Sequence, residues 1–272
     1  MKYYYKFFIF FIALFLIYLF IKFNINKKSE DLEILYEDDY IIVIVKPVSI
    51  ASHDAPNWHG KTVVQILINN GYTLYNDNYS YQDGIVHRLD VGTSGIMVLA
   101  KNKFAYDNLK DQFKYRTVIK KYITLIEGEI EPKSGTINEP IGTTIYNERG
   151  VVPNGKTSVT HYKTLHVFPE SKIFPTLSLL EVNLETGRTH QIRIHFSHMK
   201  HPLVGDFRYG ANSTLAADLG INHQWLHAKY LEFNHPLTGK RFIFNSEIPS
   251  NLKQTLDFIS NNTVIPFTFF IK

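Results

Sequence analysis

The residues from Val86 to Lys101, which read VHRLDVGTSGIMVLAK, constrain the fold of this chain most. They place one aspartate, Asp90, between two short apolar runs that are rich in branched side chains. Such runs are typical of buried strands, and the glycines and small polar residues between them are typical of a loop. We therefore expect strands at Ile85–Val86 and Ile96–Leu99, joined by a loop that carries Asp90.

Asp90 itself allows two interpretations. In the first it belongs to an ordinary turn and bonds to nearby backbone amides, while Gly92 and Gly95 supply unusual dihedral angles. In the second it is a functional group, because a carboxylate between buried strands loses its hydration unless a cation or hydrogen-bond donors meet it. The loop alone does not decide between them.

The loop and several later segments together resemble the RluA family of RNA pseudouridine synthases. The family pattern HRLD, TSG and AK is intact between His87 and Lys101. The other matching segments follow the family order and are Val45-Lys46-Pro47 with His53, Lys121-Tyr122 to Glu127-Gly128, Thr186 to His195, and His201 to Asp206 with Trp225 to Ala228. The resemblance covers about Leu32 to Leu256 and is nearest to the large-subunit ribosomal, RluD-like branch. Too few residues precede Leu32 for the S4-type RNA-binding domain that relatives in this branch commonly carry.

The resemblance implies an α+β fold with a mixed, mainly antiparallel sheet, flanking helices and a central RNA-binding cleft. It implies an enzyme without cofactors that isomerises specific uridines to pseudouridine in RNA, with 23S-type ribosomal RNA favoured over transfer RNA. Asp90 is then the essential catalytic carboxylate, acting on a flipped-out uridine. Arg193 is its counter-ion, and Tyr122 stacks on the base and is a candidate to take the C5 proton. Arg88 contacts the RNA and holds the base out of the stack.

Charge adds an expected RNA-binding surface. The net charge is only +4, but Lys110, Lys114, Arg116, Lys120 and Lys121 crowd one segment, which suits RNA phosphates. A solvated helix face is the alternative. The full expected RNA-binding set is His87, Arg88, Lys114, Arg116, Lys120, Lys121, Arg188, His190 and Gln191, where Arg188 is either a phosphate contact or a structural donor.

Local patterns predict three elements near these residues. Asn102 can cap a helix in which Ala105, Leu109 and Phe113 form an apolar stripe. A strand follows from Lys120 to Glu127, with Tyr122, Thr124 and Ile126 on one face. Arg188 to Phe196 alternates between polar and apolar residues, which favours a half-buried strand with Thr189, Gln191, Arg193 and His195 on its polar face.

The histidines and the lack of cysteine limit metal and thiol chemistry. The chain has no cysteine, which excludes disulfides, cysteine metal ligands and a thiol nucleophile. His190, His195, His198 and His201 have a spacing that matches no standard zinc pattern. We expect no metal, and these histidines are interpreted as core or RNA-facing donors.

The two ends of the chain are treated separately. Residues 7–21 form an unbroken apolar run between lysines, and as a helix it would span about 22 Å of a hydrocarbon core of roughly 30 Å. A membrane anchor, an organelle-targeting segment and an overextended start of the coding sequence all stay open. We expect residues 1–30 to stand apart, 31–262 to form a monomeric, cytoplasmic catalytic domain, and 263–272 to be an aromatic tail.

Two other functions fit parts of the sequence. A non-catalytic RNA-binding protein that keeps the scaffold predicts loss of Asp90, Tyr122 or Arg193, and all three are present. A membrane-tethered hydrolase would need a serine elbow or paired carboxylates at fixed spacing, and neither occurs.

Overall fold

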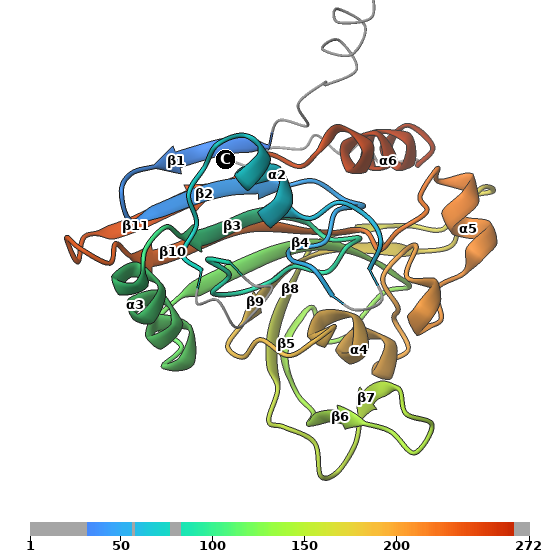
Figure 1. Cartoon of the computed structure of the whole chain (residues 1–272). Coiled ribbons are helices and arrows are strands. Elements are labelled where there is room, and N and C mark those ends of the chain that lie inside the picture. Colours follow the sequence, from blue (N-terminus) through green and yellow to red (C-terminus); the bar gives the residue numbers. More distant parts are fainter. Residues whose placement is uncertain (1–31, 56–57, 77–82, 264–272) are drawn as a thin grey trace, which may run out of the picture. The chain divides into compact units, whose positions relative to one another are not determined.

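The computed structural model describes residues 32–55, 58–76 and 83–263 (Figure 1). These residues belong to a compact unit that begins at Leu32. Its elements are, in chain order, β1 (Glu33–Glu37), β2 (Ile41–Lys46), α2 (Val63–Asn69), β3 (Ser94–Ala100), α3 (Lys103–Lys114), β4 (Ile119–Glu127), β5 (Ser134–Asn138), β6 (Ile141–Thr143), β7 (Arg149–Val151), β8 (Val159–Phe168), β9 (Leu177–Leu184), α4 (Gln191–His198), the 3-10 helix η1 (Phe207–Tyr209), α5 (Ser213–Asp218), β10 (Leu226–Asn234), β11 (Arg241–Asn245) and α6 (Ser250–Asn261).

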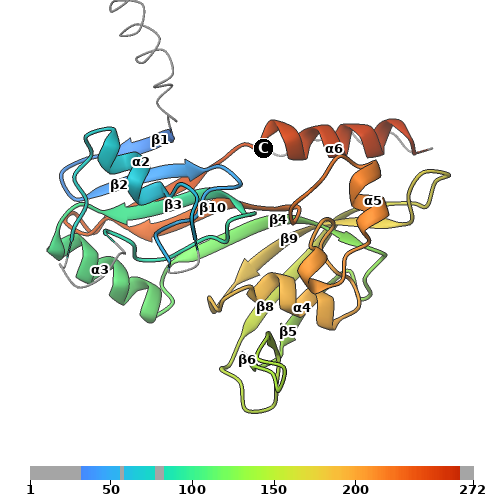
Figure 2. The same ribbon diagram turned by 45° about the vertical axis from the view of Figure 1, so that its right-hand side comes forward.

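Nine of these strands form one sheet in the order β1-β2-β3-β10-β4-β9-β8-β5, with β11 paired to β10. Strands β3 and β10 are parallel, and the other pairs in this sheet are antiparallel. The expected α+β class with a mixed, mainly antiparallel sheet is therefore confirmed. The β6–β7 hairpin projects from the body at the end away from α6 in both views (Figures 1 and 2).

The parallel pair β3–β10 requires glycine at its centre. Gly95 has φ +123° and pairs with Ala228. A Cβ atom at Gly95 would lie 2.3 Å from the Ala228 carbonyl oxygen, so a larger residue would push the strands apart. Since the Asp90 loop leads directly into β3, this close approach fixes where the loop meets the sheet.

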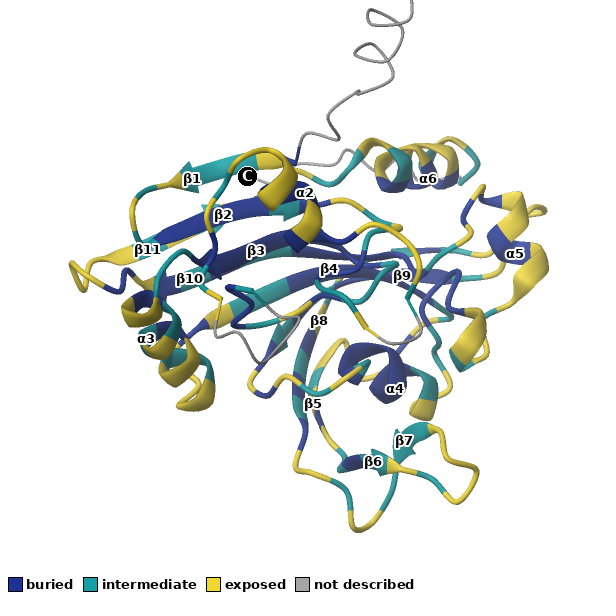
Figure 3. Cartoon of the chain, viewed as in Figure 1, coloured by how far each residue is buried: buried dark blue, intermediate teal, exposed yellow. Residues whose placement is uncertain are grey.

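Apolar side chains cover both faces of the sheet. One cluster joins β4 residues Tyr122 and Ile126 to α2 and α4, and a second joins Ile123 and Leu125 to α5 and α6. Figure 3 shows the buried residues concentrated in the central strands and in α4. The two-residue alternation predicted for the strand from Lys120 to Glu127 is thus confirmed.

The helix predicted after Asn102 is also confirmed. Asn102 is the N-cap of α3, and its side chain accepts a hydrogen bond of 2.9 Å from the Ala105 amide. Ala105 and Leu109 are fully buried, and the half-buried Phe113 continues the stripe.

The prediction of a strand at Ile85–Val86 is wrong, because this segment does not form a regular strand. Ile85 makes only an isolated bridge to Leu99, in the part of β3 that follows its pairing with β10 at Ser94 and Gly95. The Gly84 carbonyl accepts from the Ala100 amide, but the next edge amide, from Val98, donates to the His87 ring at 3.1 Å. A side chain therefore replaces the backbone acceptor, and regular pairing stops.

The strand predicted from Arg188 to Phe196 is wrong, because these residues begin a helix. His190 adopts a left-handed conformation with φ 58°, and α4 starts at Gln191. All residues from 191 to 196 are buried, so polar and apolar side chains alike find partners inside the protein. A helix that is buried on all sides has no polar face. The short alternation of polar and apolar residues in its sequence therefore resembles the pattern of a strand.

The expected segment 7–21 and residues 264–272 of the expected tail lie outside the described residues. In the part of the chain that the structure describes, no helix combines the length and the apolar character needed to cross a bilayer.

Candidate active site

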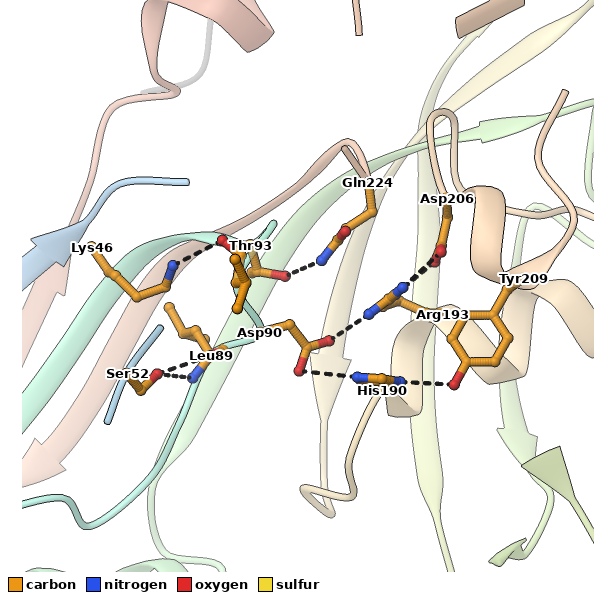
Figure 4. A network of polar contacts seen from close by, with 11 residues as sticks. Lys46, Ser52, Leu89, Asp90, Thr93, His190, Arg193, Asp206, Tyr209 and Gln224 are labelled. Carbon is orange, nitrogen blue, oxygen red and sulfur yellow. Dashed lines mark hydrogen bonds and ion pairs between the residues drawn. The ribbon is translucent and has the colours of Figure 1, made fainter. Parts of the chain in front are cut away.

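The loop that carries Asp90 is fixed on both sides of the aspartate (Figure 4). Before it, the Ser52 hydroxyl accepts from the Leu89 amide at 3.0 Å and donates to the Leu89 carbonyl at 2.8 Å. After it, the buried Thr93 hydroxyl accepts from Gln224 at 3.1 Å, and the Thr93 amide donates to the Asp90 carbonyl. The backbone around the carboxylate therefore has little freedom to move.

A buried lysine also binds the loop that carries Asp90. Lys46, at the end of β2, is fully buried, and its ammonium donates to three carbonyl oxygens, those of Pro47, Ile50 and Val91, at 2.7, 2.8 and 3.3 Å. Burial lowers the pKa of Lys46 to about 7, although the nearby charge of Asp90 opposes this shift. Three acceptors match the three N–H donors of an ammonium group, so Lys46 ties the Asp90 loop to the chain after β2.

Arg193 on α4 joins two carboxylates. Its Nε and Nη2 atoms each lie 2.7 Å from an oxygen of Asp206, and its Nη1 lies 3.1 Å from Asp90 Oδ2. Burial acts to lower the pKa of Arg193, but hydrogen bonding and attraction to Asp206, with a further contribution from Asp90, raise it above its usual range. The expected contact between Arg193 and Asp90 is thus present, and the cation that makes it stays charged.

His190 lies on the other side of the same carboxylate. Its Nε2 atom is 3.8 Å from Asp90 Oδ1, and its Nδ1 atom is 2.8 Å from the Tyr209 hydroxyl. His190 is the N-cap residue directly before α4 and Arg193 lies in its first turn, so the start of α4 brings both side chains to Asp90. A strand would have turned them to opposite faces.

Asp90 lies at the wall of a cleft of about 530 Å³, with a smaller cavity of about 60 Å³ beside it. Asp90, Tyr122, Arg88 and Arg188 line both. Four more of the expected RNA-binding residues line the cleft, namely His87, Lys114, Arg116 and Lys120. Burial lowers the pKa of Lys120 to about 8, with repulsion from Arg116 adding to the shift. The cleft is therefore basic around a carboxylate.

Tyr122 lines the cleft together with basic residues of α3 and is nearly buried, with 8% of its surface exposed. Burial raises its pKa above the usual range, and the charge of Asp90 adds to this shift. The phenol is accordingly protonated at neutral pH. Its ring offers an apolar face beside the carboxylate.

His87 has a structural role at the cleft edge. Its Nε2 atom accepts from the Val98 amide, and its ring stacks on Phe113 with the centroids 4.6 Å apart. Burial lowers its pKa to about 3, and Lys120 adds to the shift. The ring is therefore neutral and cannot supply a charge to a phosphate.

Lys121 and Gln191, both expected to bind RNA, do not line the cleft. Lys121 is on the opposite face of β4 from Lys120 and Tyr122, where it lies 3.5 Å from Glu181 and over the Tyr230 ring. Gln191 is buried and its amide is fully used inside the protein. It accepts from the Thr186 hydroxyl and the Arg188 amide and donates to the Val159 carbonyl and the Thr160 hydroxyl. Gln191 therefore lines the smaller cavity with its amide already satisfied by the protein.

The sequence alone predicts no role for Lys46, Asp206 or Tyr209, although the first two stand in segments that resemble the family. A lysine directly after the apolar run Ile41–Val45 was one local signal, since a strand rarely ends in a buried cation without a purpose. Asp206 and Tyr209 gave no local signal. Within the described residues, no three histidine, aspartate or glutamate side chains are grouped to hold a metal ion.

Comparisons with known proteins agree on one family. A family model described as RNA pseudouridylate synthase matches residues 40–198. An uncharacterized RNA pseudouridine synthase of Mycobacterium bovis is 46% identical over 235 residues, which cover 86% of this chain and 74% of that protein. Ribosomal large subunit pseudouridine synthase D of Nitrosomonas europaea is 40% identical, with 87% and 67% covered. The solved structure of human RNA pseudouridylate synthase domain containing 1 aligns with TM-score 0.64 and 27% identity over 82% of this chain and 85% of that one.

Proposed function

The chain belongs to the RluA family of RNA pseudouridine synthases, and from this premise we propose that it isomerises specific uridines of large-subunit ribosomal RNA with Asp90 as the reacting carboxylate. Isomerisation of uridine in RNA is the activity of the family. The choice of ribosomal RNA is supported by relatives that are named for the large ribosomal subunit.

The observation that supports Asp90 most directly is its position. Its carboxylate is 3.1 Å from the Arg193 guanidinium, on a loop held from both sides, at the wall of a basic cleft. The positive charge of Arg193 favours an ionised carboxylate. Attack on ribose C1′, attack on the pyrimidine and removal of a sugar proton all require that form.

The reaction is balanced without a redox partner. The bond from ribose C1′ to uracil N1 breaks, the base rotates and a bond from C1′ to C5 forms. The C5 proton leaves and N1 gains a proton, so the product is an isomer of the substrate. The protein therefore needs to supply an ionised group, a proton path and a surface that retains the free base while it turns.

The target uridine has to leave the base stack to reach Asp90. Flipping costs roughly a few kcal/mol, which contacts to phosphates and to the flipped base must offset. The cleft volume of about 530 Å³ is in the range of small-ligand pockets, ~300–1,000 Å³. Arg88, Lys114, Arg188 and Tyr122 line this cleft, and we propose that the three cations meet phosphates and that Tyr122 offers its ring to the base.

The decisive variant is Asp90→Asn, which keeps the size of the side chain and removes its charge. We expect pseudouridine formation to be abolished while RNA affinity stays within a few-fold of the wild type, because only the reacting group changes. Chemical mapping of pseudouridines in total RNA from cells with and without this gene identifies the RNA and the position. Modification by the variant at a comparable rate would show that Asp90 is not the reacting group, and a lost site in transfer RNA alone would exclude ribosomal RNA as the target.

A further inference from the structure

The strained backbone at His190 places its ring between Asp90 and Tyr209. His190 has φ 58°, a left-handed conformation that few residues other than glycine adopt, although histidine is among the tolerated ones. Its ring is 15% exposed and lies 3.8 Å from Asp90 on one side and 2.8 Å from the Tyr209 hydroxyl on the other (Figure 4). Strain of this kind persists where the surrounding structure enforces it, and it occurs often at functional sites.

Tyr209 is held so that it supports both groups that face Asp90. The Ser197 hydroxyl on α4 donates to the Tyr209 carbonyl at 2.7 Å. The Arg193 guanidinium lies over the Tyr209 ring, 5.0 Å from its centroid, and the His190 ring meets the same ring edge-on. Tyr209 therefore contacts Arg193 through its ring and His190 through its hydroxyl.

Asp90 favours one tautomer of His190, and the Tyr209 hydroxyl, which can donate or accept, accommodates that tautomer. If the hydroxyl donates to Nδ1, the imidazole proton is on Nε2 and points toward Asp90. The opposite arrangement would turn a nitrogen lone pair toward the carboxylate, which is unfavourable electrostatically. Burial lowers the pKa of His190, and Arg193 and Arg208 add to this effect against the opposing charges of Asp90 and Asp206. His190 is thus a neutral donor whose N–H faces Asp90 Oδ1.

We propose that His190 is a positioning residue that donates its Nε2 proton to Asp90 Oδ1 when RNA occupies the cleft, in the tautomer that Asp90 favours and the Tyr209 hydroxyl accommodates. The present separation of 3.8 Å is longer than a hydrogen bond, and catalytic contacts of this type shorten in the substrate complex. Asp90 then has one oxygen held by Arg193 and the other by His190, so the carboxylate cannot rotate during the reaction. This inference rests on the proposed role of Asp90.

Two substitutions at His190 distinguish loss of the N–H donor from a disturbance of the fold. Glutamine places an N–H close to the imidazole Nε2 position, whereas asparagine tolerates the left-handed backbone but places its N–H near Nδ1, too far from Asp90. We expect His190→Asn to lower kcat roughly 10- to 100-fold, the effect of losing one hydrogen bond to a charged group, with KM for RNA unchanged. His190→Gln should recover most of the lost kcat.

The split between kcat and KM, together with the rescue by glutamine, distinguishes positioning from a merely structural role. A structural defect at the start of α4 would disturb the cleft and raise KM for RNA, and glutamine would not repair it. Loss of the Nε2 donor alone should lower kcat at constant KM, and glutamine should reverse it. Tyr209→Phe keeps the ring under Arg193 but removes the hydrogen-bond partner that holds His190 Nδ1, and we expect kcat to fall roughly tenfold in it.

Each outcome decides one of the two proposals. If Asp90→Asn is still active, the proposed function is wrong and this inference fails with it. If Asp90→Asn is inactive while His190→Asn and Tyr209→Phe keep the wild-type kcat, only the inference is overturned. It is also overturned if His190→Asn and His190→Gln lose activity equally. Melting temperatures of all variants identify any that fail to fold, and Tyr209→Phe then carries the test.

Discussion

Arg193 and Asp206 form a buried two-bond ion pair, with Nε and Nη2 of the guanidinium each 2.7 Å from a carboxylate oxygen. This geometry uses one edge of the planar guanidinium and leaves Nη1 for Asp90 at 3.1 Å. A guanidinium is rigid, so fixing one edge also fixes the direction of the remaining N–H groups. Asp206 therefore aligns the cation that faces the candidate catalytic carboxylate.

Asp206→Asn tests this alignment. The variant leaves Arg193 buried without its main counter-charge, and removal of one partner of a buried ion pair costs about 3–5 kcal/mol of unfolding free energy. We expect kcat to fall together with stability, because Nη1 is no longer held against Asp90. Urea unfolding and single-turnover kinetics measure the two effects.

The matched control is Asp107→Asn, which breaks the exposed pair between Lys103 and Asp107 on α3. Exposed pairs contribute little to stability, and this variant should be indistinguishable from the wild type in both assays. Equal behaviour of the two variants would contradict a special role for Asp206.

The parts of the site that could be predicted from sequence are those with a local cause. The cap at Asn102 needs only the next three residues, and the faces of β4 need only alternation, so both were predictable. Helix α4 was not, because its six buried residues take their partners from distant segments, as Gln191 does from Val159 and Thr160. Asp206 and Tyr209 likewise reach the site only through the packing of η1 against α4.

Lys120 and Lys121 provide a matched pair for the RNA surface. They are neighbours on β4, yet Lys120 lines the cleft and Lys121 lies beside Glu181 on the opposite face. We expect Lys120→Gln to weaken RNA binding and to reduce the slope of log affinity against log salt by about 1, whereas Lys121→Gln should leave both unchanged. Filter binding of an RNA fragment at several salt concentrations gives both quantities. Similar losses in the two variants would mean that RNA also contacts the far face of the sheet.

His87 should destabilise the fold in acid. In the folded protein the pKa of His87 is about 3, below the ordinary value of 6.5. As pH falls from 6.5 toward 3, His87 is therefore protonated in the unfolded chain and stays neutral in the folded protein. The free energy of unfolding therefore decreases on acidification, by at most about 1.4 kcal/mol per pH unit from this residue. His87→Gln keeps an acceptor for the Val98 amide and cannot titrate. We expect a flatter stability profile below pH 6.5 in this variant, measured by urea unfolding, while His59→Gln on the exposed loop should follow the wild type.

The two roles proposed for Tyr122 can be separated by substitution. If its ring stacks on the flipped base, Tyr122→Leu should weaken RNA binding by roughly 1–3 kcal/mol, and Tyr122→Phe should preserve affinity. The raised pKa of Tyr122 means that its hydroxyl can accept the C5 proton only while it passes its own proton on, and Asp90 is the neighbour whose charge acts on it. We therefore expect Tyr122→Phe to slow tritium release from RNA labelled at uridine C5 by roughly 100-fold or more. Release at the wild-type rate in this variant would remove the hydroxyl from the proton path and leave Tyr122 as a stacking surface alone.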